Sequence, residues 1–220
     1  ADYVCKAGDY LRILPAVLMK NFDRFRMQTE NENLREQLEK LVEANEAQNE
    51  TLQELSSLDP LTLLKNHRCM QDRLKSEINL AGRHLHSVSV ILADIDALGQ
   101  INEDYAPEVG DLAIKKMAEI FLEETRENSG VAGRLGGGEF MLILPGSEMI
   151  EAVMVAQRLR LEIEDTSFES EGEVIKMTSS FGVAGFNSQE FAGREELIKL
   201  SQRALYHAKE EGGNRVSWPE

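Results

Sequence analysis

Two carboxylates stand at the end of an apolar run near the middle of the chain. Residues 88–93 are apolar and rich in β-branched side chains, which is typical of a buried strand, and Asp94-Ile95-Asp96 follows directly. Side chains alternate along a strand, so Asp94 and Asp96 share one face if the strand continues through them. Hard cations such as Mg²⁺ take oxygen ligands, often one or two carboxylates completed by phosphates and water. The pattern indicates a candidate cation site; the alternative is that Asp94 only terminates the strand.

A glycine run lies between two further apolar stretches. Gly136-Gly137-Gly138-Glu139 interrupts residues 131–144, which predicts two short strands joined by a tight turn. Glycines allow such a turn to direct free backbone amides toward a phosphate. Most glycine turns only close a hairpin, so the run by itself leaves both interpretations open.

Strand and helix patterns alternate around these residues and must position them. We expect an α/β sandwich whose sheet is mixed or antiparallel, because the glycine turn permits a hairpin. The expected elements are strands at 88–93, two within 131–144, one at 175–186 and one at 215–217, and helices at 108–128, 148–165 and 194–211.

A heptad pattern precedes this domain. Leucines recur at spacings of three and four over residues 23–57, with Asn31 and Asn45 on the inner row and charged side chains elsewhere. This pattern is typical of a two-stranded coiled coil, and it predicts a homodimer formed through a rod of roughly 50 Å. The alternative is a solvated linker helix.

Composition excludes several classes of function. The chain has 220 residues, 42% of them hydrophobic, and a net charge of −15, which argues against binding a nucleic-acid polymer. Two cysteines are too few for a disulfide framework or a zinc site, so a cytoplasmic location is expected. The apolar run at 13–19 is short and contains Pro15, so neither a membrane span nor a signal peptide is expected.

Several stretches in matching order resemble the GGDEF family of diguanylate cyclases. They are DPLTLLKNHR at 59–68, ADIDALGQINEDYAPEVGD at 93–111, RLGGGEF at 134–140, SSFGVA at 179–184 and ALYHAKEEGGNRV at 204–216. The resemblance implies a nucleotidyl-cyclase, ferredoxin-like domain over residues 58–220, preceded by the coiled-coil helix at 23–57. Residues 1–22 resemble the last strand and helix of a two-component receiver domain; alternatively, they pack on the main domain.

The resemblance implies roles for particular residues. Metal binding falls to Asp94 and the backbone carbonyl of Ile95, with Mg²⁺ as the cofactor when nucleotide is bound. Nucleotide binding falls to Asn102 and Asp111, which read guanine, to Gly136 and Gly137 of the turn, and to Lys209, which contacts phosphate. The alternatives are that Asn102 is a turn residue and Asp111 a helix cap.

The chain departs from the family where the triphosphate and metals bind. Gly138 stands where the family has an acidic residue, and Gly99 and Gly213 stand where it has cationic phosphate contacts. Loss of one bridging carboxylate, taken as about 4 kcal/mol of transition-state stabilisation, lowers a rate roughly a thousandfold. Glu139 is the remaining candidate catalytic acid, but alternation along a hairpin predicts that it points away from the position of Gly138.

These departures favour a degenerate GGDEF domain of a response regulator in cyclic di-GMP signalling. It would act as a dimeric regulatory module with a weakened GTP pocket and little catalysis. The alternative is an active diguanylate cyclase that condenses two GTP to cyclic di-GMP and two pyrophosphates. A third hypothesis is an output domain that binds only a partner protein, which the sequence does not identify.

Overall fold

The computed structural model describes residues 57–84, 86–127, 130–170, 172–186 and 193–219, together with helical positions scattered between 18 and 42. The chain divides into two compact units, Ala1–Leu52 and Gln53–Glu220, which are described separately.

The described part of the first unit is helical. Residues 18–22 and 24–28 form helix, and so do single positions as far as Val42. Leu34 and Leu38, which belong to the two rows of the heptad pattern, are 57% and 64% exposed. The strand expected at 1–6 and the coiled-coil residues after Val42 lie outside the described residues, so the receiver remnant and the coiled coil stay predictions.

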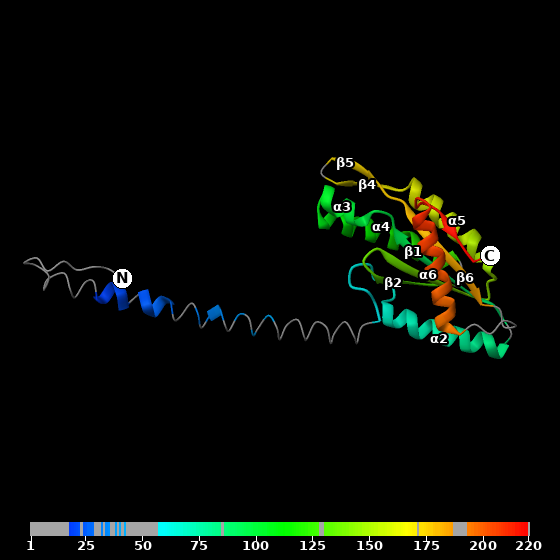
Figure 1. Cartoon of the computed structure of the whole chain (residues 1–220), viewed down its shortest axis with the longest axis horizontal. Helices are drawn as coiled ribbons and strands as arrows, with labels where there is room; N and C mark the ends of the chain where they lie inside the picture. Colours follow the sequence, from blue (N-terminus) through cyan, green and yellow to red (C-terminus); the bar gives the residue numbers. More distant parts are fainter. Residues whose placement is uncertain are drawn as a thin grey trace, which may run out of the picture. The chain divides into compact units, whose positions relative to one another are not determined.

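The second unit is built on a mixed five-stranded sheet (Figure 1). Its strand order is β2-β3-β1-β6-β7, antiparallel throughout except for the parallel pair β6 and β7. A separate hairpin pairs β4 with β5. The bounds are β1 Val88–Ile95, β2 Val131–Gly136, β3 Glu139–Pro145, β4 Ser167–Ser170, β5 Glu173–Lys176, β6 Ser179–Phe186 and β7 Val216–Ser217.

Helices cover both faces of the sheet, because the strands are apolar on both sides. One core contains Met117, Phe121 and Leu159 of α4 and α5, and the other contains Leu74 and Leu197 of α2 and α6. The short α3 follows β1 directly. The bounds are α2 His67–His84, α3 Leu98–Asp104, α4 Pro107–Glu127, α5 Met149–Asp165 and α6 Arg194–Glu210.

The expected α/β fold class is confirmed, and one expected strand is wrong. Residues 175–186 form parts of two strands rather than one, because β5 pairs with β4 in the separate hairpin while β6 joins the main sheet. Between them, the carbonyl of Thr178 accepts a hydrogen bond from the Asp96 amide, which turns the chain toward the end of β1.

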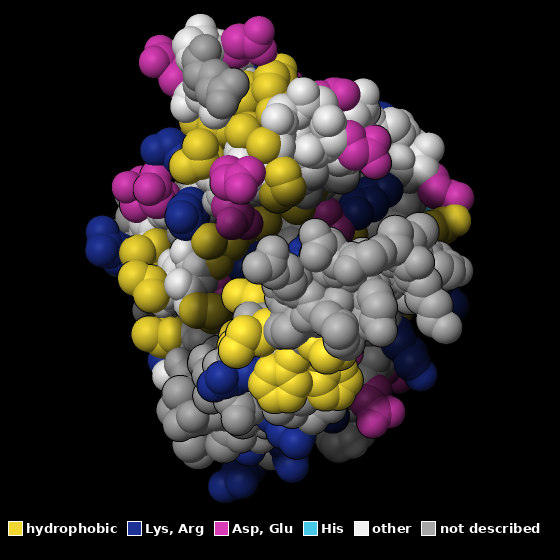
Figure 2. All heavy atoms as spheres, turned by 90° about the vertical axis from the view of Figure 1, so that its left-hand side faces the viewer, with side chains coloured by type: hydrophobic (Ala, Val, Ile, Leu, Met, Phe, Trp, Pro, Cys, Tyr) yellow, Lys and Arg dark blue, Asp and Glu magenta, His cyan; other side chains and the backbone are white. Residues whose placement is uncertain are grey.

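The surface of the described residues is rich in acidic groups. Figure 2 shows acidic side chains gathered with hydrophobic ones at the top of the view, at the height of the β4–β5 hairpin. Val174 of β5 and Tyr105, which follows α3, are exposed. Among the described helices, none combines the length and the apolar character needed to cross a bilayer.

Candidate nucleotide site at the end of β1

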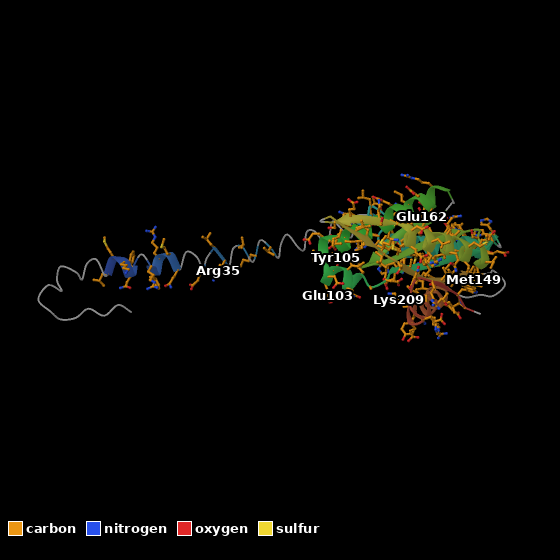
Figure 3. The ribbon with its side chains drawn as sticks, turned by 90° about the horizontal axis from the view of Figure 1, so that it is seen from above. Arg35, Glu103, Tyr105, Met149, Glu162 and Lys209 are labelled. Atoms are coloured by element: carbon orange, nitrogen blue, oxygen red, sulfur yellow. The ribbon has the colours of Figure 1, made fainter. Side chains whose placement is uncertain are left out.

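The centre of the candidate site is an ion pair between the sheet and α6. Lys209, in the last turn of α6, donates from Nζ to Oδ2 of Asp94 over 2.6 Å. The Asp94 side chain is 15% exposed and that of Lys209 is 41% exposed. Figure 3 labels Lys209 on α6 and Glu162 on α5, which flank the sheet from opposite sides. A lysine implied to contact phosphate therefore neutralises the carboxylate implied to hold metal.

Asp96 has a structural role instead. The strand ends at Ile95, so Asp96 lies in a turn and the condition for a face shared with Asp94 is not met. Its carboxylate accepts hydrogen bonds from Thr178 Oγ1 (2.8 Å), Ser180 Oγ (2.6 Å) and the Asn214 amide (2.8 Å). These bonds tie β1 to β6 and to the loop after α6, and they leave Asp96 engaged within the protein.

The glycine turn places position 138 beside Asp94. Gly136 ends β2 and Gly137 begins the two-residue turn to β3; their φ values of 144° and 51° are conformations that glycine adopts without strain. A Cβ on Gly138 would lie 3.4 Å from Asp94 Oδ1 and 3.0 Å from Leu98 Cδ2. A carboxylate at position 138 would thus point at Asp94, as the resemblance implies, and glycine leaves that place without one.

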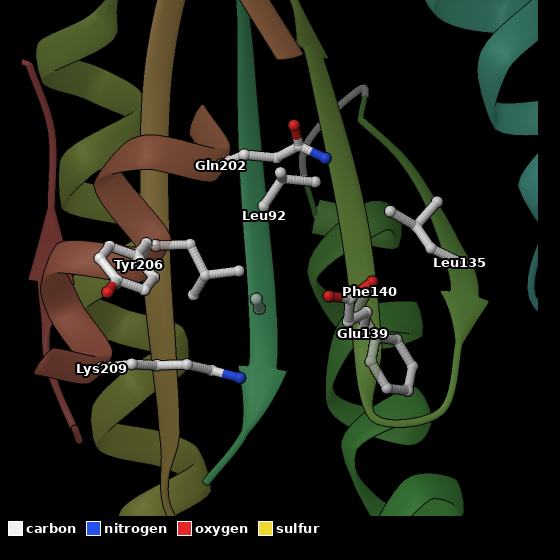
Figure 4. Close-up of a pocket in the computed structure, with 9 residues that line it drawn as sticks. Leu92, Leu135, Glu139, Phe140, Gln202, Tyr206 and Lys209 are labelled. Carbon is white, nitrogen blue, oxygen red and sulfur yellow. The ribbon is translucent and has the colours of Figure 1, made fainter. Parts of the chain in front are cut away.

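Glu139 is closer to the site than alternation predicted. Gly138 belongs to the turn rather than the strand, so the alternation rule does not apply between positions 138 and 139. Glu139 is the direct cross-strand partner of Asp94, and such pairs lie on the same face of a sheet. It lines a cavity of about 280 Å³ together with Lys209, Gln202 and Tyr206 (Figure 4). Glu139 therefore lies on the same face as Asp94 and lines the cavity that Lys209 also lines.

The two residues implied to read guanine are close along adjoining helices. Asn102 lies within α3, and its amide fills the space beside Gly110, where a Cβ would overlap Asn102 Oδ1. Gly110 directly precedes Asp111, an exposed residue in the second turn of α4. Asn102 is therefore not a turn residue, and Asp111 lies inside the helix rather than at its cap, so both alternatives are wrong.

Asn102 Oδ1 is an unsatisfied buried atom. In the part of the chain that the structure describes, it is the one buried side-chain nitrogen or oxygen without a hydrogen-bond partner. Such an atom costs free energy unless a ligand or water pairs with it. An amide side chain offers both an acceptor oxygen and a donor nitrogen to a guanine edge.

Arg134 clamps the glycine turn and was missed in the sequence. Its guanidinium donates from Nε and Nη2 to the carbonyl of Gly137 (3.0 and 2.9 Å) and from Nη1 to Asp59 Oδ1 (3.2 Å). The signal was a charged residue within the otherwise apolar run 131–135. This pair joins the DPLT motif to the turn.

Asp59 is held ionised by its neighbours. Partial burial acts to raise the pKa of Asp59, but hydrogen bonds from the Thr62 hydroxyl and amide and the charge of Arg134 outweigh it, so its pKa lies below the ordinary value. Because the pKa of Asp59 is lowered by folding, the ionised carboxylate stabilises the fold fully above its unfolded-state pKa of about 3.9. This contribution is lost as the pH falls through the pKa of Asp59 in the folded protein.

Asp59→Asn tests this contribution. At neutral pH we expect the free energy of unfolding to fall by about 2 kcal/mol, because charge-assisted hydrogen bonds are lost. The difference between wild type and variant should shrink below about pH 4 as Asp59 becomes protonated. Urea unfolding at a series of pH values measures it, and a difference that stays constant into acid would contradict the assignment.

The residues present do not fit a bound divalent cation. Position 138 lacks a carboxylate, and that of Asp94 is neutralised by Lys209. The described residues hold no group of three or more His, Cys, Asp and Glu side chains that could bind a metal ion. The two missing phosphate contacts are glycines, and at Gly213, with φ of 74°, a Cβ would lie 3.1 Å from Asp96 Cγ.

Curated proteins share this domain. Diguanylate cyclase A of Treponema denticola is 31% identical over 172 residues, which cover 77% of this chain and 46% of that protein. Diguanylate cyclase DosC of Escherichia coli K12 is 34% identical over 160 residues, covering 72% of this chain and 34% of that one. The chain thus spans between a third and a half of the length of these relatives.

Solved structures share the fold. The GGDEF domain of DgcB from Caulobacter crescentus, in complex with c-di-GMP, superposes with a TM-score of 0.70 at 24% identity, over 74% of this chain and 95% of that one. A second DgcB structure that includes its coiled coil gives 0.69 at 21% identity, over 93% and 98%. The family model "Diguanylate cyclase, GGDEF domain" matches residues 56–215. With the sheet, the glycine turn and the Asp94 strand end in place, the chain belongs to the GGDEF family.

Proposed function

We propose that this chain is a catalytically impaired GGDEF module in cyclic di-GMP signalling that keeps a pocket for guanine nucleotides. The observation that carries the impairment is Gly138, where a side chain would point at Asp94 but none exists. Two-metal phosphoryl transfer needs negative ligands that hold both ions on the attacking and leaving oxygens. Asp94 alone, paired with Lys209, does not supply them.

The retained base pocket supports nucleotide binding. Asn102 and Asp111 keep the amide and carboxylate that suit guanine, which presents an acceptor at O6 and donors at N1 and N2. Neither residue serves as a turn or a cap, and the Asn102 amide, which packs beside Gly110, keeps a buried oxygen without a hydrogen-bond partner.

An active diguanylate cyclase is the second candidate, favoured by one observation. Glu139 faces Asp94 across the sheet and borders the same cavity as Lys209, so it is the acid that could assist a displaced metal. The relatives named as diguanylate cyclases support the same reading. Incubation of the purified chain with GTP and Mg²⁺ separates the candidates: repeated turnover to cyclic di-GMP would refute the impaired module.

Asn102→Ala tests the base pocket. We expect the affinity for GMP, measured by calorimetry, to fall about five- to thirtyfold, because the loss of a buried hydrogen bond to a ligand costs about 1–2 kcal/mol. Gln100→Ala is the matched control, since Gln100 also lies on α3 but lines a cavity with Ala97 and Ile101 to which Asn102 does not contribute. Equal affinities for wild type and Asn102→Ala would contradict the assignment of the pocket, and no binding to wild type would favour a domain that binds only a protein partner.

The module is proposed to be a cytoplasmic homodimer within a response regulator. Support comes from the heptad pattern at 23–57 and from the receiver-like residues 1–22. Sedimentation of the chain with and without residues 1–57 tests the dimer, which should dissociate when the helix is removed. We also propose that the module binds a partner protein, which the sequence does not identify.

A further inference from the structure

The carboxylate near the end of β1 is paired with a positively charged side chain of α6. Lys209 Nζ lies 2.6 Å from Asp94 Oδ2, within the distance of a strong charge-assisted hydrogen bond. Figure 4 shows the Lys209 side chain extending from α6 across the strands, with Glu139 on the neighbouring strand. The ammonium group is therefore paired with Asp94, and Lys209 lines a cavity with Glu139, the cross-strand partner of Asp94.

We infer that the ammonium of Lys209 replaces the divalent cation at this site, and that the site consequently takes guanine nucleotides without Mg²⁺ and without preference for a triphosphate. We call the claim about Lys209 the cation half and the claim about nucleotide binding the nucleotide half. Only the nucleotide half rests on the proposed function.

The cation half follows from charge and space. Without an acid at position 138, the carboxylate of Asp94 carries one charge, and Lys209 cancels it. A divalent ion would have to displace the ammonium from Asp94. It would gain only the carboxylates of Asp94 and Glu139 and the Ile95 carbonyl, and Mg²⁺ gives up its hydration reluctantly. Loss of the lysine would free Asp94, whose cross-strand partner is Glu139.

The nucleotide half follows from the same pairing. Lys209 is engaged by Asp94, and positions 99 and 213 are glycines, so the three cationic phosphate contacts implied by the family are engaged or missing. Glu103 and Asp104 of α3 are exposed and add negative charge close to Asn102. GTP carries about two more negative charges than GMP, which this acidic surface disfavours when no metal accompanies them. Recognition should depend on the base, with GMP bound at least as tightly as GTP.

Thermal unfolding with MgCl₂ alone tests the cation half. Wild type should show no change in melting temperature, whereas Lys209→Met should rise by about 5 °C at saturating MgCl₂, as expected for a ligand at roughly 100 times its dissociation constant. Lys209→Gln is a second variant of the same kind. Lys199→Met is the matched control, because Lys199 is an exposed lysine of the same helix and should behave as wild type. A magnesium-dependent rise in wild type that Asp94→Asn abolishes would overturn the inference.

Calorimetry with GMP and GTP, each in excess EDTA or excess MgCl₂, tests the nucleotide half. The expected result is a GMP affinity equal to or higher than that of GTP, with less than about a threefold change on adding MgCl₂, which corresponds to well under 1.4 kcal/mol. GTP binding that requires MgCl₂ and exceeds GMP binding about tenfold would overturn the inference while upholding the proposed pocket. Absence of binding by either nucleotide would overturn the proposed function and this half together, while the melting experiment alone decides the cation half.

Discussion

Gly182→Ala is expected to lower the free energy of unfolding by about 3 kcal/mol, because overpacking against rigid backbone is among the costlier changes in a core. Gly182 lies in β6, and a Cβ there would overlap the Ser201 carbonyl oxygen and the Leu205 amide, and would lie 2.8 Å from Leu205 Cα. Backbone atoms of a helix cannot turn away as a side-chain end can. The helix α6 would have to move off the sheet, and with it Lys209.

Urea unfolding followed by circular dichroism measures this change. Gly82→Ala is the matched control, since Gly82 lies within α2 and a Cβ there has no neighbour within 4 Å. The control should gain up to about 1 kcal/mol through helix propensity. A Gly182→Ala protein as stable as wild type would show that α6 can shift without loss, and the ion pair with Asp94 would then not depend on this close approach.

Gly138→Glu is expected to raise the rate of cyclic di-GMP formation from GTP and Mg²⁺ by about a thousandfold over wild type, if a bridging carboxylate supplies about 4 kcal/mol to the transition state. The backbone at position 138 accepts a side chain, since its φ is not positive and the nearest neighbour of a Cβ is the flexible end of Leu98. The new carboxylate would lie beside Asp94 and compete with it for Lys209.

Detection of cyclic di-GMP by chromatography provides the measurement, with Gly138→Gln as the isosteric control that lacks the charge. The double variant Gly138→Glu, Asp94→Asn should return to the wild-type rate. A rate unchanged by Gly138→Glu would mean that the glycines at 99 and 213 already prevent productive binding of the triphosphate.

Much of the fold was predictable because its elements carry local signals. The apolar run before Asp94, the glycine turn and the amphipathic helices α4, α5 and α6 were anticipated within a few residues. The division of 175–186 into β5 and β6 was not, because both halves read as strand and only pairing with β4 separates them. The backbone of Leu63 was not predictable either, because it adopts φ of 59°, the left-handed conformation that glycine favours, with a leucine side chain.

The residues of the site were predictable by type but not by partner. Asp94 and Lys209 were assigned to metal and phosphate, and nothing in their spacing of more than a hundred residues indicated that they bind each other. Glu139 was placed on the wrong side because alternation was applied across a turn residue. Asp96 looked equivalent to Asp94, although donors from Thr178 before β6, Ser180 of β6 and Asn214 after α6 engage it.

The contacts of Arg134 bear on which substitutions the glycine turn tolerates. The carbonyl of Gly137 is fixed from outside the turn by a guanidinium that is itself anchored on Asp59, so the shape of the turn is maintained by the protein alone. The residue at position 138 is therefore free to change its chemistry while the scaffold around it persists. A single substitution there can change the chemistry of the site without unfolding the domain, which leaves the fold available for another function.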